Sequence, residues 1–493
     1  MTHARNLSNR GTDFVSVKDY GAVGDGVTDD TAAFFAAQAA SNSILIPPGT
    51  YLLDQFIHAN RTVFRGSGLN NTFIKQAATG RPAWWCVSNA TYNTGQVQGA
   101  ELTGVWFLGK SGSTVASCIV EATAPQCVAY SNFDFGASGG YHSLEIKTGS
   151  AFEVYSSRFS VVQHDWDNRS GGVGSTNTGV VTGQGVYNEF YLNIVQCANG
   201  IAVDDTSWDC VFRHVVSDGQ QKYQGQENTI IGPTVEGWTG TAQTSAIANL
   251  GAANLLINPH VVNVPRSKVL GAAIEYNGGG GTPSTTIGLR VLGQTAAITF
   301  TGALVAATSA TLTSAWTLDA SGVYKVTFSD GSVRNATFTN GGTSVTWSGA
   351  VTATAAASVA YNAPAYPVYL PPGNSGTFIS AQTIPCPYTL ENYPNTAYVT
   401  APTAATLSSF QFVSDCSSMT TRGGYYADRG TATFSAAATV AVTFAKAQPD
   451  TSYFVSLGAQ ANKTFWVSAK TTSGFTLNAS SASSDTVDWV LSR

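Results

Sequence analysis

The chain has 493 residues, enough for one elongated core with accessory domains. Charged side chains make up 11% of it, against about 25% in ordinary soluble domains, and its net charge is −5. With no basic stripe, this balance argues against a nucleic-acid partner. No run approaches the roughly 20 apolar residues that cross a bilayer, so membrane insertion is not expected.

The first ten residues lack the apolar segment of a secretory signal. We therefore expect a chain that is made in a reducing host cytoplasm and leaves by lysis. The seven cysteines have neither CxxC nor metal-ligand spacing and are expected to be buried free thiols.

Residues 17–51 follow the pattern strand, Gly/Asp turn, helix, strand. Val17–Tyr20 has strand-like composition, and the glycines after it permit a tight turn. Thr28–Asp30 offers a hydroxyl and two carboxylates to the N-terminus of a helix expected at 31–40. Ile44–Ile46 then predicts a buried strand.

This segment resembles the opening of the pectate-lyase-like, right-handed parallel β-helix proteins, especially bacteriophage tailspikes. The resemblance implies an all-β solenoid over residues 17–290, with the helix at 31–40 capping its N-terminal edge. It also implies a homotrimer in a virion tail. Residues 1–16 would be a short extension, so either attachment uses a short peptide or a tail or baseplate adaptor protein, or the chain is part of a longer protein.

A weak repeat between residues 185 and 264 supports a solenoid independently. Segments starting at Asn188, Asp209, Asn228 and Asn254 lie 21, 19 and 26 residues apart, a spacing suited to successive coils. We expect their strands to stack about 4.8 Å apart. The shared Asn/Asp position predicts a structural turn or a stacked side-chain ladder.

The pattern changes after the solenoid. Residues 291–368 alternate small, apolar and hydroxyl residues with Gly-rich turns, which predicts a β-hairpin domain or insertion. Residues 369–493 resemble the C-terminal antiparallel β-sandwich modules of phage tail proteins, which implies trimerisation or carbohydrate binding. Trp466 and Trp489 there could stack on sugars or pack in a core.

The resemblance implies a protein that cuts or binds bacterial surface polysaccharide. Glycoside hydrolysis needs one carboxyl group to protonate the leaving oxygen and a second, roughly 5 to 9.5 Å away, as nucleophile or base. Acids on adjacent coils meet this requirement. Our hypothesis is a tailspike depolymerase that hydrolyses capsule, exopolysaccharide or O-antigen at the bacterial cell surface.

The first candidate site is the segment 163–169, followed by a Gly/Ser/Thr-rich run. As a projecting loop it would offer Asp165 or Asp167 for acid–base work, with Trp166 and Arg169 binding the sugar. The alternative is an Asp-rich turn whose carboxylates bond their own backbone.

Two further acid sites lie in, or directly after, predicted strands. Asp204 and Asp205 follow a strand and could share a proton, or could simply turn the chain. Glu189 lies inside a strand, which suits a rigidly held general acid with a raised pKa, although it could be a solvated surface residue. Trp208, Arg213 and His214 are further candidates for substrate binding.

Three alternatives remain open: a uronate lyase, a non-catalytic glycan-binding fibre and a cell-wall pectin enzyme. A lyase would draw its base and cations from Arg213, His214, Lys222 and Tyr223. Calcium could then use Asp204, Asp205 and Asp209. Because the chain has no dense Asp cluster, we expect neither a metal nor another cofactor.

Overall fold

The computed structural model describes residues 14–148, 153–164, 180–195, 200–238, 241–249, 251–276, 284–364, 366–369, 376–382, 410–413, 429–444, 451, 453–458 and 463–492. The chain divides into two compact units, one of residues 1–374 and 381–400 and the other of residues 375–380 and 401–493. None of the helices in this described part is long and apolar enough to cross a membrane.

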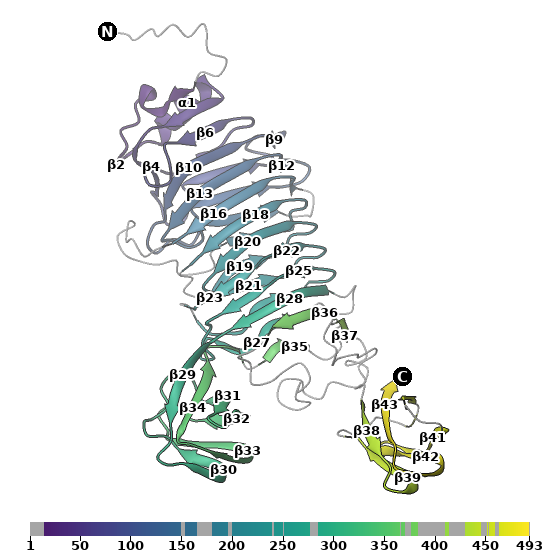
Figure 1. Cartoon of the computed structure of the whole chain (residues 1–493). Helices are drawn as coiled ribbons and strands as arrows, with labels where there is room; N and C mark the ends of the chain where they lie inside the picture. Colours follow the sequence, from purple (N-terminus) through teal and green to yellow (C-terminus); the bar gives the residue numbers. More distant parts are fainter. Residues whose placement is uncertain are drawn as a thin grey trace. The chain divides into compact units, whose positions relative to one another are not determined.

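Parallel strands wind through the first unit in successive coils, as Figure 1 shows. Each coil adds strands to parallel sheets, which we call A, B and C in the order in which the sheets first appear. Crossover connections between parallel strands are right-handed in nearly all proteins. The predicted all-β, right-handed parallel β-helix is confirmed.

Sheet A extends along the solenoid. Its register is continuous from Glu101 through Asn132, Arg158 and Glu189 to Val211. Its strands in the solenoid are β1 (Val15–Ser16), β2 (Asp25–Asp29), β3 (Ser43–Ile46), β4 (Gly49–Leu53), β6 (Val63–Gly66), β7 (Thr72–Gln76), β10 (Glu101–Leu108), β13 (Asn132–Ser138), β16 (Arg158–Gln163), β18 (Glu189–Ile194), β20 (Val211–Ser217), β22 (Thr229–Ile231), β23 (Thr234–Glu236), β25 (Leu255–Ile257), β26 (His260–Val262) and β28 (Ser284–Leu292).

Sheets B and C complete the coils. Sheet B contains β5 (Phe56–Ile57), β8 (Trp84–Ser88), β11 (Cys118–Ala122), β14 (Leu144–Thr148), β17 (Val180–Thr182), β19 (Ile201–Asp205), β21 (Gln220–Tyr223), β24 (Gln243–Asn249), β27 (Val269–Tyr276) and β35 (Tyr366–Tyr369). Sheet C contains β9 (Gln96–Gln98), β12 (Cys127–Ala129) and β15 (Val154–Tyr155). Single parallel bridges continue sheet C from Tyr155 through Val186 and Trp208 to Gln226.

The N-terminal edge differs from prediction at Val17–Tyr20 and in the Gly/Asp turn, where Asp25–Asp29 forms strand β2. Val17–Tyr20 forms the 3₁₀ helix η1 rather than a strand. The side chain of Ser16 accepts a hydrogen bond from the Lys18 N–H while Asp19 accepts one from the Ser16 N–H. This reciprocal capping outweighs the strand-like composition. Helix α1 (Thr31–Ala40) lies where it was predicted and buries Phe34 completely.

The predicted cap of α1 is correct only for Asp29, whose carboxylate accepts the Thr31 N–H at 2.9 Å. Asp30 is buried and binds backward, accepting the N–H groups of Val23 and Gly24 at 2.6 and 3.1 Å. The Thr28 hydroxyl, predicted to cap the helix, donates instead to the Asp25 carboxylate at 2.8 Å. The Gly-rich turn has amides of its own to satisfy, and a buried carboxylate within reach satisfies two of them.

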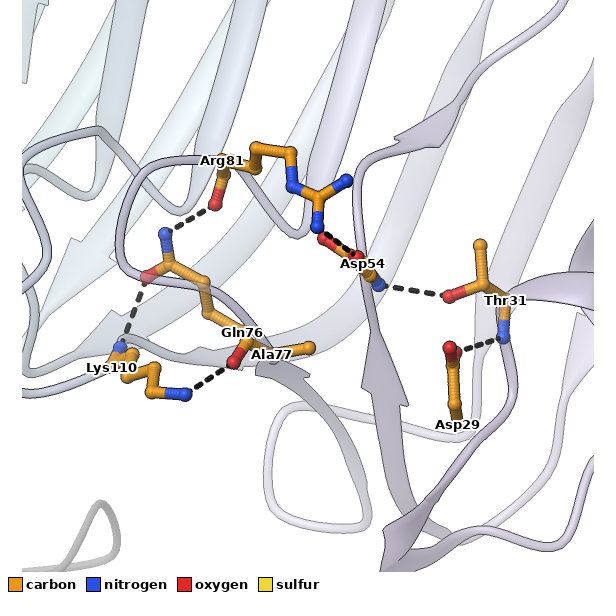
Figure 2. Close-up of polar contacts among 7 residues, drawn as sticks. All are labelled: Asp29, Thr31, Asp54, Gln76, Ala77, Arg81 and Lys110. Carbon is orange, nitrogen blue, oxygen red and sulfur yellow. Dashed lines mark hydrogen bonds and ion pairs between the residues drawn. The ribbon is translucent and has the colours of Figure 1, made fainter.

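A polar network ties α1 to the first coils (Figure 2). The Asp54 N–H donates to Thr31 Oγ1 at 2.8 Å, and the Asp54 carboxylate pairs with Arg81 Nη2 at 2.7 Å. Gln76 then donates to the Arg81 carbonyl oxygen at 2.8 Å and accepts the Lys110 N–H at 3.0 Å. The capping helix is thereby fixed to the coils beneath it.

The residues directly before β10, β13, β16, β18, β20, β22 and β25 form a ladder that runs from coil to coil and ends at Ser284, the first residue of β28. Each backbone N–H donates to the side chain of the equivalent residue in the next coil. The ladder comprises Ala100, Ser131, Ser157, Asn188, Cys210, Asn228, Asn254 and Ser284, at donor–acceptor distances of 2.9 to 3.3 Å. The predicted stacking position is correct for three asparagines but wrong for Asp209, because Val211 pairs with Glu189 and brings Cys210 into line.

The solenoid interior is filled by stacked aromatic and apolar rows. Four phenylalanines of consecutive sheet A strands stack with ring centroids 4.6 to 5.6 Å apart: Phe133, Phe159, Phe190 and Phe212. Four cysteines of the described residues are buried and free, as expected: Cys86, Cys118, Cys127 and Cys210. The other three cysteines lie outside the described residues.

An antiparallel sheet is inserted between β28 and β35. Its strands, in spatial order, are β29 (Gln294–Thr299), β34 (Ala356–Tyr361), β31 (Gly322–Phe328), β32 (Val333–Phe338), β33 (Ser344–Ala353) and β30 (Leu304–Thr311). Arg266 joins it to the solenoid: its guanidinium lies 3.8 Å from the Tyr324 ring centroid and donates to the Ala363 carbonyl oxygen at 3.1 Å. Sheet B resumes afterwards, because β35 pairs with β27.

The second unit contains two antiparallel sheets that share one apolar core. One sheet has the order β38 (Arg429–Thr433), β43 (Thr486–Ser492), β40 (Phe454–Gly458), and the other has β39 (Ala437–Thr443), β42 (Gly474–Ser483), β41 (Phe465–Thr471). Strands β36 (Gly376–Gln382) and β37 (Phe410–Val413) form a parallel pair. Trp489 is buried in the core, whereas Trp466 is 47% exposed.

Candidate functional site

The first predicted site lies outside the described residues. The four residues of this site come after His164, the residue that follows β16: Asp165, Trp166, Asp167 and Arg169. Their proposed roles stay predictions, and the candidate site is built from the outer faces of sheets A and B.

Asp204 and Asp205 point to opposite sides of β19, so they cannot share a proton. The alternation of side chains along a strand separates neighbouring residues. Asp204 faces outward and pairs with Lys222 Nζ at 3.7 Å. Asp205 faces the interior and is fully buried.

Asp205 is held by hydrogen bonds inside the solenoid. Its carboxylate accepts bonds from the Thr182 hydroxyl, the Ser207 N–H and hydroxyl, and Asn228 Nδ2. Burial raises the pKa of Asp205 to about 6, although these bonds favour the charged form. Because it has no exposed surface, the predicted catalytic role of Asp205 is wrong for this conformation, and the residue is structural.

Glu189 lies on the outer face of sheet A within a group of charged and aromatic residues. Its Oε1 accepts Arg213 Nε at 2.8 Å and the Tyr191 hydroxyl at 3.0 Å, while Arg158 lies 4.6 Å from the Tyr191 ring centroid. Partial burial would raise the pKa of Glu189, but bonding to Arg213 and Tyr191 outweighs this, and the pKa is lowered. The raised pKa expected of a general acid is not found, so Glu189 suits an ionised role.

The remaining predicted binding residues do not form one cluster with that acid. Trp208 is 40% exposed on the sheet C side, and His214 is exposed at an irregularity of β20, with φ of 53°. Tyr223, a proposed lyase base, is completely buried and donates to Gln221 Oε1 at 3.0 Å. That lyase assignment is therefore wrong for Tyr223.

The outer face of sheet B brings together aromatic and acidic residues that the sequence interpretation missed. Trp85 of β8 lies against Tyr92, with ring centroids 5.3 Å apart. Its indole Nε1 donates to Glu121 Oε2 of β11 at 3.0 Å. Tyr92 is 36% exposed, so the rings form an accessible apolar surface beside a carboxylate.

A second carboxyl group, that of Glu145 in β14, lies one coil further along. In the register, Ile119 pairs with Glu145 and Glu121 with Lys147. Glu121 and Glu145 are thus diagonal neighbours on adjacent strands, with Cα atoms about 8 Å apart for strands spaced by about 4.8 Å. Lys147 Nζ lies 3.5 Å from Glu145 Oε2.

The two environments differ chemically. Burial raises the pKa of Glu145; Glu121 adds to the rise, and Lys147 opposes it. The Glu145 side chain is nevertheless 22% exposed and can be reached from solvent. We call Trp85, Tyr92, Glu121, Glu145 and Lys147 the sheet B cluster.

The comparison with known families places the solenoid. Residues 14–240 match the family model described as rhamnogalacturonase A/epimerase, pectate lyase-like. The solenoid over residues 14–240 is therefore similar to pectate-lyase-like proteins. All five residues of the sheet B cluster lie within the matched pectate-lyase-like segment.

Relatives of this pectate-lyase-like chain are phage proteins. The preneck appendage protein of Bacillus phage PZA is 25% identical over 236 residues, which cover 41% of this chain and 25% of that protein. The pre-neck appendage protein of Bacillus phage B103 is 44% identical over 61 residues, 12% of this chain and 7% of that protein. The chain thus spans about a quarter of the first relative's length.

Among solved structures, the tailspike gp61 of Pseudomonas phage phi297 aligns with a TM-score of 0.48 and 12% identity, over 98% of this chain and 99% of that one. The predicted superfamily is confirmed, and the relatives agree with the predicted location in a virion tail.

Proposed function

We propose that this pectate-lyase-like protein is a phage tail appendage that hydrolyses glycosidic bonds of a bacterial surface polysaccharide at the sheet B cluster. The observation that carries the proposal is a pair of carboxyl groups on adjacent coils beside an exposed aromatic surface. Glu121 and Glu145 lie one diagonal step apart, and Trp85 contacts Glu121 directly.

In this mechanism Glu145 is the general acid. Because its raised pKa keeps more of it protonated near neutral pH, it can give its proton to the leaving glycosidic oxygen. Glu121 is then the nucleophile or the base that activates water. The indole N–H of Trp85 donates to the Glu121 carboxylate at 3.0 Å and orients it.

The aromatic rings position the substrate. The apolar face of a sugar ring packs on Trp85 or Tyr92, while Lys147 offers a donor or cation to substituents of the sugar. Lys147 also limits the rise in the Glu145 pKa, so the Glu145 carboxyl group can still release its proton to the leaving oxygen.

Mass spectrometry of host surface polysaccharide, after incubation with the protein, tests the proposal. Fragments that carry one added water, absent with Glu145→Gln, are the expected result. Unsaturated fragments without that water would establish a lyase instead. Binding without any change in polymer size would establish a glycan-binding fibre.

The assembly is a second part of the proposal. We expect a homotrimer, carried in the virion by a tail or baseplate adaptor protein, because solenoids that pack side by side bury their remaining apolar flanks. Light scattering at micromolar protein is expected to give three times the chain mass of 51.3 kDa. A stable monomer mass would contradict it.

A further inference from the structure

One accessible aromatic ring occurs on each of four consecutive coils, at the corner where sheet C leads into sheet A. Tyr155 and Trp208 occupy one sheet C row, in the register that runs from Ala129 through Tyr155 and Val186 to Trp208. Tyr130 and Tyr187 directly follow Ala129 and Val186 and form the neighbouring row. We call these four residues, Tyr130, Tyr155, Tyr187 and Trp208, the aromatic ridge.

The four residues of the ridge alternate between the two rows on successive coils of the solenoid. Tyr130 and Tyr155 have ring centroids 5.7 Å apart in an edge-on arrangement. Tyr130 is 62% exposed, Tyr187 60% and Trp208 40%. With coils about 4.8 Å apart, the ridge repeats over a length comparable to one sugar residue per coil.

Local stability does not explain why tyrosine occupies two of these positions. Tyr130 and Tyr187 have φ of 51° and 56°, in the left-handed region that is a genuine outlier for bulky residues. Gly99 fills the equivalent corner one coil earlier, with φ of 63°. Tyrosine there costs roughly 1–2 kcal/mol of backbone strain that glycine avoids. The same left-handed corner recurs at Ser156, Asp209 and Glu227, with φ of 49°, 49° and 60°, so the conformation belongs to the coil, and what distinguishes Tyr130 and Tyr187 is their exposed ring.

The ridge is also held rigidly. Its two strained tyrosines immediately precede ladder residues Ser131 and Asn188, and Trp208 lies two residues before Cys210. The Tyr155 hydroxyl lies 3.8 Å from Cys127 Sγ. Rings fixed in this way lose little conformational entropy when a ligand packs on them.

The surroundings of the ridge favour a carbohydrate over a second protein chain. The next positions of the two rows are polar or charged: Asp209 and Glu227 follow Tyr187 in one, and Gln226 follows Trp208 in the other. Charged residues are depleted at the core of stable protein interfaces. Carboxylates and amides beside aromatic rings instead suit the hydroxyl groups and apolar faces of a sugar chain.

We propose that the aromatic ridge is an extended polysaccharide-binding site, separate from the sheet B cluster, along which successive sugar residues pack on successive rings. It shares only its ligand class with the proposed function and requires no cleavage. Its role is to retain the long polymer on the protein between cleavage events.

The test uses the full-length chain and an array of purified bacterial capsular, exopolysaccharide and O-antigen polysaccharides. The variant is Tyr130→Gly with Tyr187→Gly, which removes both rings and relieves the strain at both corners. Tyr20→Ala, which removes a partly exposed tyrosine from the N-terminal 3₁₀ helix η1, is the matched control. Binding to the positive polysaccharides is then measured for each protein, together with its melting temperature.

The proposal expects the double variant to melt at or above the wild-type temperature yet to bind the polymer about tenfold more weakly, or worse. Glu145→Gln is expected to slow cleavage about 10²- to 10⁴-fold while the ridge keeps its binding, so failure of the proposed function and failure of the ridge give different results. Unchanged binding by the double variant, or no binding by the wild type to any polysaccharide on the array, would overturn the proposal. So would conversion of an oligomer to a monomer with glycan binding intact, which would make the ridge a subunit interface.

Discussion

The outer faces of sheets A and B both carry glutamates, and the two faces treat them in opposite ways. On sheet A, Glu189 is bonded by Arg213 and Tyr191, and its pKa is lowered. On sheet B, Glu145 is more deeply buried and lies near Glu121, and its pKa is raised. The difference shows that position on a rigid strand does not make a glutamate a proton donor. Burial and the neighbouring charged and polar side chains decide it.

The largest expected effect separates the two faces by activity. Glu145→Gln removes the proton donor with little change in shape, and the rate of polymer cleavage is expected to fall about 10²- to 10⁴-fold. Reducing-end release from the host polysaccharide measures that rate. Glu189→Gln is the matched control on sheet A and is expected to stay within a few-fold of wild type. The reverse ranking would transfer the site to sheet A.

The interior acid provides a third environment and a large effect on stability. Asp205→Ala leaves buried donors of Thr182, Ser207 and Asn228 unsatisfied and is expected to destabilise the fold by about 3 kcal/mol. Urea unfolding measures the change. Asp204→Ala, the outward neighbour, is expected to change it little, and equal losses for both would contradict the opposite orientation of the two side chains.

Asp205 also predicts a pH dependence of stability. Its pKa is about 6 in the folded chain and about 4 when unfolded. Between these values the folded state holds a proton that the unfolded state releases. The contribution of Asp205 protonation to the free energy of unfolding is therefore fully present below pH about 4 and is lost as the pH rises to about 6. The free energy of unfolding of the Asp205→Ala variant is expected not to show this fall as the pH rises.

The pH profile of cleavage sharpens the assignment of Glu145. If Glu145 must be protonated, the rate falls about tenfold per pH unit above its pKa. Lys147 holds that pKa down, so Lys147→Met is expected to raise it further and to move the fall toward higher pH. Initial rates across the pH range measure this shift. A fall that moves to lower pH would contradict the general-acid role.

The smallest effect concerns the ion pair on sheet A. Glu189 and Arg213 are 37% and 40% exposed, so Arg213→Gln is expected to cost about 0.5 kcal/mol or less, and less still in high salt. Because the Glu189 pKa is lowered, its contribution is present above the unfolded pKa and is lost as the pH falls through the folded one. Thermal melts at neutral and acidic pH measure it. A loss of several kcal/mol would show that sheet A depends on the pair.

The sequence predicted the solenoid and helix α1 because both rest on local patterns. The apolar run and its flanking polar residues determine α1, and the spacing of Asn188, Asn228 and Asn254 reports the coil repeat. Local patterns also misled: Val17–Tyr20 has strand-like composition, but Ser16 and Asp19 close a helical turn. Tertiary and capping bonds outweighed propensity there.

The sheet B cluster could not be located in the same way. Trp85, Glu121 and Glu145 are separated by 36 and 24 residues, and the turns between their strands differ in length. A change of one residue in any turn would move a side chain to the other face of the sheet. The same uncertainty placed Asp209, rather than Cys210, in the ladder. A signal was available in the adjacent Trp84 and Trp85, since two tryptophans in succession on a strand place one ring outside.

The ladder before the sheet A strands has a direction. The backbone N–H of each ladder residue from Ala100 to Asn254 donates to a side chain of the next coil along the chain, and the last acceptor is Ser284. The ladder N–H of a coil therefore gains its side-chain acceptor only when the next coil has formed. While the solenoid lengthens from its N-terminus, the ladder N–H of its newest coil bonds to water until the next coil supplies its side chain. Each coil of the solenoid is thus stabilised by a hydrogen bond to the coil that follows it.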